Sequence, residues 1–253
     1  MRILLTGGAG DLASVLSKTL DARGDTAVRL DVRPPADSRG IFVQGSLLDL
    51  PTLESSMSGA DCVVHIAAWH GIHEARGEKD VFDFWSLNVT GTFYVFETAA
   101  RLGITRVVFI SSTSVEERDT IYGQSKIVAE TIAQGYVERL GLNVITLRPR
   151  AFIPHWNRQA YNNFVEWAHW FWGGAVHIND VAQGVLQSID LLAARPLPEH
   201  LVLTLDGAYD FSDDDLAAWD ADGAGSTFRR VYPQYVELAL RHGLDPARRP
   251  EKR

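Results

Sequence analysis

The chain has 253 residues, of which 46% are hydrophobic and 22% charged, a composition typical of a globular protein with a substantial core. Its net charge of −8 argues against a general surface for nucleic acid or anionic membranes. The single cysteine, Cys62, excludes an internal disulfide framework and paired-cysteine metal sites, and no segment has the pattern of a signal peptide or membrane span. We therefore expect a cytoplasmic protein that acts without a metal, a nucleic acid or a membrane.

Short apolar runs alternate with helical patterns over the first 149 residues. The apolar runs predict strands, and the stretches with apolar residues three or four positions apart predict helices. In chain order, strands are expected at 2–6, 26–31, 41–45, 61–68, 106–111 and 143–149, and helices at 12–23, 50–60, 80–102 and 121–140. This alternation predicts an α/β fold, a Rossmann-type doubly wound parallel sheet with right-handed crossovers.

The rhythm changes after residue 149. Residues 150–174 are rich in Trp, Tyr and Asn without a strand pattern, and a helix that begins near residue 179, a strand over 200–207 and two short helices follow. This is too little for an independent second domain. We expect a single domain over residues 1–253, with a sheet core at 1–149 and a small C-terminal lobe at 150–253, interleaved with the last sheet strands.

The turn after the first predicted strand, TGGAGDLA at residues 6–13, has the spacing of small residues that favours dinucleotide binding. Gly8 is expected to permit the tight turn and Gly10 to let backbone N–H groups approach a pyrophosphate, while Ala13 lets the following helix pack closely. Asp31, at the end of the second predicted strand, is placed to accept hydrogen bonds from ribose hydroxyls and to repel a 2′-phosphate, which favours NAD over NADP. A turn cap is the alternative role for Asp31.

Residues 111–126 hold two serines at the end of a predicted strand, then a tyrosine, then a lysine four residues later. Oxidation of an alcohol requires a base for the hydroxyl proton, and a tyrosine with a pKa near 10 is a poor base at neutral pH. Lys126 lies on the same helical face as Tyr122, so its charge is placed to stabilise the tyrosinate. For this pair alone, two surface side chains on a polar helix are the alternative.

Together these segments resemble the short-chain dehydrogenases/reductases, and VHINDVAQGV at 176–185 resembles their extended branch, the NAD-dependent epimerase/dehydratase family. The resemblance covers about residues 1–190 and includes HIAA at 65–68, NVTGT at 88–92 and YGQSK at 122–126. It implies that Ser112, with Ser111 as the alternative, hydrogen-bonds the reacting oxygen. It also implies that Tyr122 is the base and that Lys126 additionally binds the nicotinamide ribose.

The resemblance implies two further sets of contacts, with the core binding NAD and the lobe completing the substrate site. The implied cofactor contacts are Gly7, Gly8, Gly10, Asp11, Leu12, Asp31, Ser46, Leu47, Ala67, Ala68, Asn88, Ile110, Tyr122, Lys126 and Pro149. The implied substrate contacts are Trp69, His70, Ser111, Ser112, Arg150 and Arg158.

Several of these residues have structural alternatives. Asn88 is expected either to face the cofactor or substrate or to serve as a cap or helix–helix contact. His65 is interpreted as a hydrogen-bonded strand histidine, and the aromatic residues of 150–172 as either substrate contacts or the core of the lobe. Two positions depart from the family pattern: Ser46 replaces a common acidic residue, and Ala151 replaces the asparagine that is frequent in enzymes acting on sugar nucleotides.

The connection between Ser112 and Tyr122 is short, and the lobe is small. Relatives that act on nucleotide sugars usually have a longer loop here, so we expect a compact substrate such as a free sugar, a uronic acid or another polyol-like alcohol. The function predicted is NAD-dependent hydride transfer at a secondary alcohol. The alternatives are a nucleotide-sugar epimerase or dehydratase with tightly bound NAD and, third, a non-catalytic dinucleotide sensor. The resemblance also implies a homodimer formed through the helices at 80–102 and 121–140, and Val128, Ile132 and Tyr136 form an apolar stripe on the second of them.

Overall fold

The computed structural model describes residues 1–172, 174–206, 213–214, 217 and 233–243. The chain divides into two compact units. The first comprises Met1–Pro149 and Val181–Leu205, and the second comprises Arg150–Asp180 and Asp206–Arg253. The helix near residue 179 and the strand after it thus group with the sheet. The division into an NAD-binding core and a substrate lobe stays a prediction.

The first unit is built on a seven-stranded sheet in which each neighbouring pair is parallel. The strand order is β3-β2-β1-β4-β5-β6-β7. The direction of winding reverses between β1 and β4, which creates the switch point beside which ligands bind in doubly wound folds. The predicted fold class is confirmed. The strands are β1 Arg2–Thr6, β2 Thr26–Asp31, β3 Ile41–Gln44, β4 Cys62–His65, β5 Arg106–Ile110, β6 Asn143–Pro149 and β7 Leu201–Leu205.

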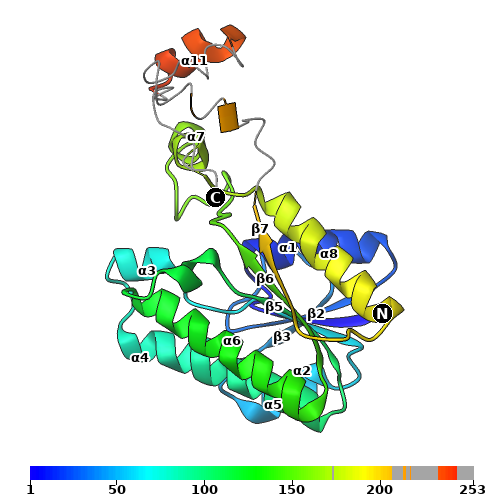
Figure 1. Ribbon diagram of the computed structural model, residues 1–253. Coiled ribbons are helices and arrows are strands. Elements are labelled where there is room, and N and C mark those ends of the chain that lie inside the picture. The colour runs from blue at the N-terminus through cyan, green and yellow to red at the C-terminus, as the bar shows by residue number, and fades with distance from the viewer. Residues whose placement is uncertain (173, 207–212, 215–216, 218–232, 244–253) are drawn as a thin grey trace. The chain divides into compact units, whose positions relative to one another are not determined.

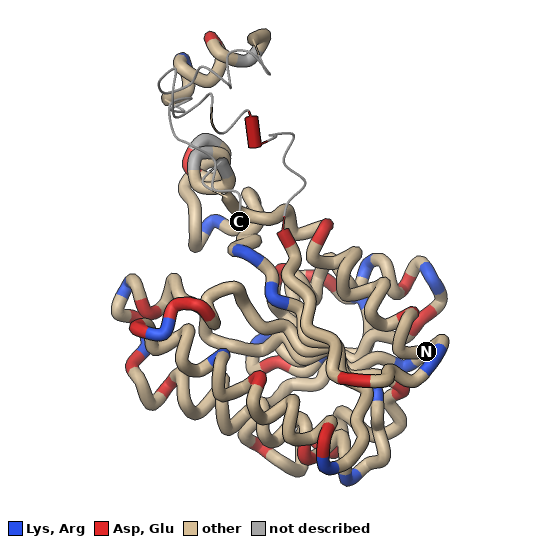
Figure 2. Tube along the Cα trace, in the orientation of Figure 1, with Lys and Arg blue, Asp and Glu red and all other residues tan. Residues whose placement is uncertain are grey.

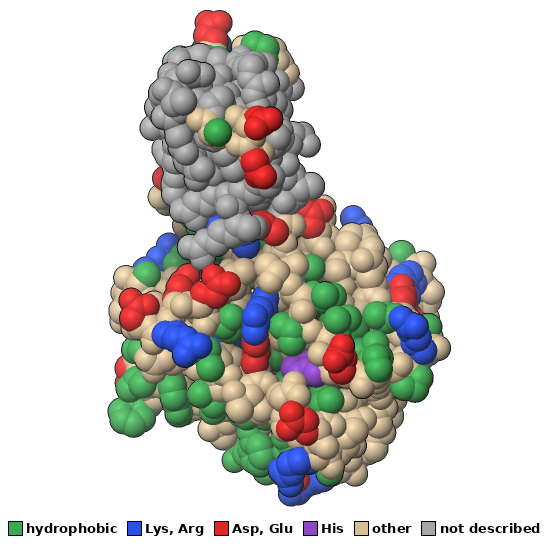
Figure 3. Space-filling model, in the orientation of Figure 1, with side chains coloured by type: hydrophobic (Ala, Val, Ile, Leu, Met, Phe, Trp, Pro, Cys, Tyr) green, Lys and Arg blue, Asp and Glu red, His purple; other side chains and the backbone are tan. Residues whose placement is uncertain are grey.

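Helices cover both faces of this sheet (Figure 1), which is why the strands are nearly continuous apolar runs. α1 (Asp11–Ala22) and α8 (Ile178–Ala194) cover one face, and α2 (Leu50–Met57), α5 (Thr92–Arg101) and α6 (Ile121–Leu140) cover the other. Charged residues concentrate on the helices and connections rather than on the strands (Figure 2). On the face drawn in Figure 3, basic and acidic side chains are interspersed.

The expected helix over 80–102 is one helical stretch with a wider segment in its middle. α4 (Val81–Phe84) begins at a capping box formed by Asp80 and Asp83, and a π-helix (Trp85–Gly91) follows before α5. A π-helical turn holds more residues than an α-helical turn and occurs frequently at functional sites. The sequence pattern did not distinguish this segment from ordinary α-helix.

Three short helices were not expected from the sequence. They are α3 (Gly71–Ala75), a 3-10 turn (Thr113–Glu116) and α7 (Phe164–Trp172). Of the two helices expected near the end of the chain, one corresponds to α11 (Val236–Arg241), and the rest of that segment lies outside the described residues.

The glycine-rich turn differs in detail from the expectation. Gly7, not Gly8, has the positive φ, +68°, that the tight turn requires. Gly8 is needed for a different reason: a Cβ atom at this position would lie 2.7 Å from the backbone of Arg29 in β2. Gly8 therefore allows the turn to rest directly on the neighbouring strand, to which its N–H donates at the Leu30 carbonyl (2.9 Å).

His65 ties the sheet to the helical layer. Its Nδ1 lies 2.8 Å from the Thr6 hydroxyl in β1, and its Nε2 lies 2.9 Å from the Thr92 hydroxyl in α5. Burial, and then the charge of Lys126, lower the pKa of His65 to about 3. It is thus a neutral, hydrogen-bonded strand histidine, as interpreted from the sequence.

We predict that Gly8→Ala destabilises the protein by about 1–3 kcal/mol, because the added methyl group overpacks the contact with β2. Gly135→Ala is the matched control. Gly135 lies inside α6 with open space around its Cβ position, so that change should stabilise by about 0.5–1 kcal/mol. Urea unfolding measures both values. Equal effects of the two substitutions would contradict this account of Gly8.

Stability should fall as the pH decreases from about 6.5 toward 3, because unfolded His65 gains a proton in this range while the folded residue does not. One such histidine contributes a slope of about 1.4 kcal/mol per pH unit. His65→Gln should reduce the slope of the unfolding free energy between pH 7 and 5, while His242→Gln, at an exposed position, should leave it unchanged. Identical slopes in all three proteins would argue against the neutral state.

Candidate active site

The glycine-rich turn leads into the N-terminus of α1. Gly10 caps this helix, and its own N–H donates to the Gly7 carbonyl (2.9 Å). The N–H groups of the first helical turn, which include those of Asp11 and Leu12, are those that a helix presents to an anion. A Cβ atom at Gly10 would lie 3.2 Å from the Gly7 carbonyl oxygen. The small residues and the helix end therefore fit a dinucleotide pyrophosphate.

A fully buried arginine supports this turn from beneath. Arg29 Nε donates to the Gly8 carbonyl (2.6 Å), one terminal nitrogen donates to Ser14 Oγ (3.0 Å), and the other pairs with Asp37 (2.7 Å). Burial opposes the charge of Asp37, but hydrogen bonds from the Arg39 N–H and from Arg29 hold its pKa below the ordinary value. Sequence reasoning missed Arg29, although an arginine inside the apolar run TAVRLD was a signal.

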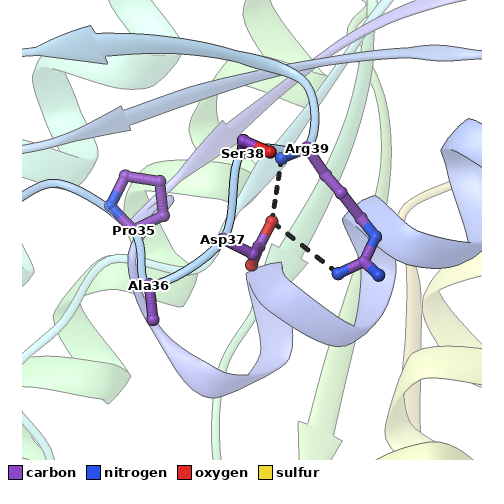
Figure 4. Close-up of a pocket in the computed structure, with 5 residues that line it drawn as sticks. All are labelled: Pro35, Ala36, Asp37, Ser38 and Arg39. Carbon is purple, nitrogen blue, oxygen red and sulfur yellow. Dashed lines mark hydrogen bonds and ion pairs between the residues drawn. The ribbon is translucent and has the colours of Figure 1, made fainter.

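Asp37 also shapes the loop that follows β2. Pro35, Ala36, Asp37, Ser38 and Arg39 line a hollow in which Asp37 accepts from the Arg39 N–H (Figure 4). Because Arg29 contacts both this loop and the Gly8 carbonyl, it fixes the two segments relative to each other.

Asp31 lies at the carboxyl end of β2, beside the glycine-rich turn. One carboxylate oxygen accepts from the Ala9 N–H (2.9 Å) and the other from the Arg33 N–H (3.0 Å). Through these contacts Asp31 caps the turn, which is the alternative role given above. Each oxygen retains a further lone pair, so the ribose contact remains compatible with this geometry and stays a prediction.

The three residues of the predicted catalytic set come together where β5 ends and α6 begins. The Ser112 side chain lies close enough to Tyr122 to lower its pKa, and the buried Lys126 Nζ donates to the Ile110 carbonyl (2.9 Å). Thr120 caps α6 by accepting from the Gly123 N–H (2.9 Å), which starts the helix one turn before Lys126. The four-residue spacing thus places both side chains at the same edge of the sheet.

The electrostatics of this set differ from the simple expectation. Burial raises the pKa of Tyr122 to about 12, against a smaller lowering by the Ser112 hydrogen bond. Burial lowers the pKa of Lys126 to about 8, against the charge of Glu130, which raises it. Tyr122 therefore carries its proton at neutral pH, and the lysine charge does not by itself create a tyrosinate.

A carboxylate from another element holds the start of α6. The two oxygens of Glu74, in α3, accept from the N–H groups of Ile121 and Tyr122, both at 2.8 Å. A Cβ atom at Gly71 would lie 3.3 Å from the Tyr122 ring, so α3 packs directly against the tyrosine. Sequence reasoning missed Glu74, because its partners lie 47 and 48 residues away in the chain.

The segment before α3 carries the predicted substrate contacts Trp69 and His70. The His70 and His73 rings lie 4.5 Å apart, and His73 Nδ1 lies 2.8 Å from Glu78. Lys79 Nζ lies 4.3 Å from the centre of the Trp69 ring. Burial, followed by the charge of His73, lowers the pKa of His70 to about 4, so His70 is neutral at physiological pH.

Asn88 is fixed by protein groups. Its side-chain oxygen accepts from the Trp69 N–H (2.8 Å), and its nitrogen donates to the Trp69 carbonyl (2.8 Å) and to Ser125 Oγ (2.9 Å). Both amide hydrogens are thus used. The structure therefore supports the helix-contact alternative, in which Asn88 joins the segment after β4 to α6.

Ser111 points to a different partner from Ser112. Its hydroxyl donates to Glu130 (2.5 Å), which also receives two hydrogen bonds from Arg148 (2.9 and 2.5 Å). This geometry favours Ser112 over Ser111 as the hydroxyl that faces a substrate. Glu130, like Glu74, was missed by sequence reasoning.

The remaining predicted contacts lie in several places. Ser46 accepts from the Leu48 N–H, the Leu47 side chain is buried, Ala67 and Ala68 follow β4, and Pro149 ends β6. Arg150 and Arg158 belong to the second unit, where Arg150 pairs with Asp206 (3.9 Å) and Arg158 donates to the Asn162 carbonyl (3.1 Å). Their contact with substrate stays a prediction.

Aromatic side chains of the second unit pack on one another. Trp167 stacks on Phe171 with ring centres 4.8 Å apart, and its indole N–H donates to the Ile153 carbonyl (3.0 Å). His155 contacts the edge of the Trp167 ring (5.5 Å). These contacts correspond to the alternative in which the aromatic residues form the core of the lobe.

None of the described helices combines the length and the apolar character that a bilayer span requires. Within the described residues there is also no group of three or more His, Cys, Asp or Glu side chains arranged to hold a metal ion.

Two proteins of known activity are similar in sequence. A uronate dehydrogenase of Pseudomonas putida is 28% identical over 60% of this chain and 62% of its own. A UDP-glucose 4-epimerase of Lacticaseibacillus casei is 30% identical over 58% of this chain and 50% of its own. The chain thus spans about half to three-fifths of the length of these relatives.

The solved structure of MoeE5 in complex with UDP-glucose and NAD shares the fold, with a TM-score of 0.68 and 22% identity over 88% of this chain and 81% of that one. Residues 3–166 match the sequence model of the NAD dependent epimerase/dehydratase family. Because this match covers more than half of the chain, the protein belongs to the NAD-dependent epimerase/dehydratase family of enzymes, and its cofactor is NAD.

Proposed function

We propose that this protein is an NAD-dependent oxidoreductase that transfers hydride at a secondary alcohol of a sugar-like or uronic-acid-like substrate. The observation that carries the proposal is the convergence of Ser112, Tyr122 and Lys126 at the carboxyl end of β5. NAD, when bound, supplies the hydride acceptor. The protein's own groups then handle the proton and the orientation of the alcohol.

In this proposal Tyr122 exchanges a proton with the substrate oxygen, and Ser112 holds that oxygen by a hydrogen bond. Since the pKa of Tyr122 is raised to about 12, the phenol is ready to donate its proton when a carbonyl is reduced. When an alcohol is oxidised, Tyr122 must accept a proton, and the positive charge of Lys126 favours that step. Trp69 and His70, beside α3, contact the substrate.

The cofactor contacts belong to the same proposal. The first turn of α1 binds the pyrophosphate, Asp31 contacts the adenosine ribose, and Lys126 binds the nicotinamide ribose. The loop held by Arg29 and Asp37 lies beyond the end of the same strand as Asp31, so it is placed to border the adenosine.

A compact substrate is supported by the connection between Ser112 and Tyr122. It consists of one 3-10 turn, Thr113–Glu116, and four further residues before α6. The similarity to a uronate dehydrogenase supports the same substrate class. Similarity to a UDP-glucose 4-epimerase favours the second candidate, a nucleotide-sugar epimerase or dehydratase that retains NAD. The intact Tyr122 and Lys126 argue against a non-catalytic dinucleotide sensor.

We further propose a cytoplasmic homodimer that forms through α5 and α6. Phe93 and Leu140 are exposed, at 43% and 52%, and are candidates for the apolar contact. Tyr136 was expected on this surface, but it is buried, and its hydroxyl donates to Glu97 (2.6 Å). Light scattering at micromolar concentration that gives the mass of one chain would contradict the dimer.

The substrate class is tested by mixing the protein with NAD and either free sugars and uronic acids or UDP-sugars. We expect NADH to accumulate with the free acids or sugars, because the short connection leaves no long cover for a nucleotide. Turnover confined to UDP-sugars would contradict the compact substrate, and conversion of a UDP-sugar without NADH release would establish the epimerase or dehydratase.

Tyr122→Phe should lower turnover by about 100-fold or more, because the proton-exchanging hydroxyl is lost. NAD affinity, measured by fluorescence titration, should change little, since the ring and the glycine-rich turn remain. Tyr94→Phe, on α5, is the matched control and should keep activity. A fully active Tyr122→Phe variant would refute the catalytic assignment.

A further inference from the structure

The carboxylate of Glu130, one helical turn beyond Lys126, joins α6 to the strands β5 and β6. Glu130 of α6 accepts from Ser111 Oγ at the end of β5 (2.5 Å) and from Arg148 of β6 (2.9 and 2.5 Å). Its side chain is only 12% exposed, whereas that of Arg148 is 33% exposed. Two hydrogen bonds from one guanidinium orient the carboxylate in a fixed plane.

The residues that Glu130 holds are neighbours in sequence of the proposed catalytic groups. Ser111 lies between Ile110, whose carbonyl accepts from Lys126 Nζ, and Ser112, whose side chain lowers the pKa of Tyr122. The Ser111 N–H donates to the Leu147 carbonyl of β6 (2.7 Å), so this strand end is held by both its backbone and its side chain. A substitution of Glu130 therefore alters the position of Ser111, and through Ser111 the positions of Ser112 and of the Ile110 carbonyl that binds Lys126.

The charge of Glu130 also acts on Lys126 directly. Lys126 is enclosed by groups from four elements: Tyr122 and Glu130 of α6, His65 of β4, His70 of the following segment, and the Phe109 ring of β5 at 5.3 Å. Both histidines are neutral at physiological pH. Burial favours the uncharged amine, and the Glu130 charge opposes this by raising the pKa of Lys126.

We propose that Glu130 is a positioning residue of this site: its carboxylate fixes the strand end that carries Ser112 and sustains the positive charge on Lys126. The inference rests on the proposed catalytic roles of Ser112 and Lys126. Glu130 itself does not touch the substrate.

The charge is tested by titration of the lysines. The chain has four lysines, Lys18, Lys79, Lys126 and Lys252, so their ¹³Cε signals are few enough to follow by NMR, with Lys126→Met to assign the signal. In NAD-saturated protein, Lys126 should titrate at a lower pH in Glu130→Gln than in the wild type. Glu138→Gln, at an exposed position two turns further along α6, should leave the Lys126 titration unchanged. An unchanged Lys126 titration in Glu130→Gln overturns the proposal.

The positioning is tested by Ser111→Ala, which keeps the Glu130 charge but removes its hold on the strand end. We expect an unaltered Lys126 titration and a kcat lower by about 10- to 100-fold with a small change in KM, because Ser112 loses its fixed position. An unchanged kcat in this variant overturns the positioning role.

Two further measurements keep the test decisive. If Glu130→Gln does not fold, as judged by circular dichroism, Glu130→Asp replaces it. That variant keeps the charge near Lys126 but withdraws it from Ser111, and it should combine a near-normal titration with a reduced kcat. If the wild type turns over no alcohol, the proposed oxidoreductase function fails, whereas the lysine titration still reports on Glu130.

Discussion

Two buried cations impose the main constraint on this protein. Arg29 and Lys126 are almost inaccessible to solvent, and a buried positive charge is costly unless protein groups surround it with acceptors. The acceptors around Arg29 are the Gly8 carbonyl, Ser14 and Asp37. The acceptor for Lys126 is the Ile110 carbonyl, and the charge of Glu130 also acts on it. Acceptors for these two charges are supplied at the carboxyl edge of the sheet. The first cation fixes the glycine-rich turn, and the second fixes the strand end at the proposed catalytic site.

At the same edge, the proposed catalytic set depends on more than its three residues. Lys126 is useful only while it is charged, and burial works against the charge. Tyr122 is held by two residues of α3: Glu74 accepts from its backbone N–H, and Gly71 packs on its ring. The geometry around the proposed catalytic set is therefore fixed in part by Glu74 and Glu130, two carboxylates outside that set.

The sequence predicted most of the fold because a parallel sheet covered on both faces produces apolar strands that alternate with amphipathic helices. It also predicted Tyr122 and Lys126, whose relation is a local helical spacing. It did not predict the contact of Arg29 with the Gly8 carbonyl under the turn, or that of Glu74 with Ile121, because these pairs form only after distant segments meet. The role of Gly8 was misassigned for the same reason, since the strand that limits it comes 21 residues later.

The hydrogen bonds around His65 have a fixed direction that follows from counting protons. The Thr92 hydroxyl has a single hydrogen, which it donates to the Asn88 carbonyl (2.6 Å), so it must accept from His65 Nε2–H. Nδ1 is then unprotonated and accepts from the Thr6 hydroxyl, which in turn accepts from the N–H groups of Ile66 and Ala67.

One imidazole tautomer is therefore selected. The hydrogen bonds that link Ile66 and Ala67, Thr6, His65, Thr92 and Asn88 all run in one direction, from the segment after β4, through the sheet, to the π-helix that carries Asn88. A second proton on His65 would face a hydroxyl whose lone pairs are already used. The direction of these hydrogen bonds is fixed at one end by the backbone N–H donors of Ile66 and Ala67 and at the other by the Asn88 carbonyl.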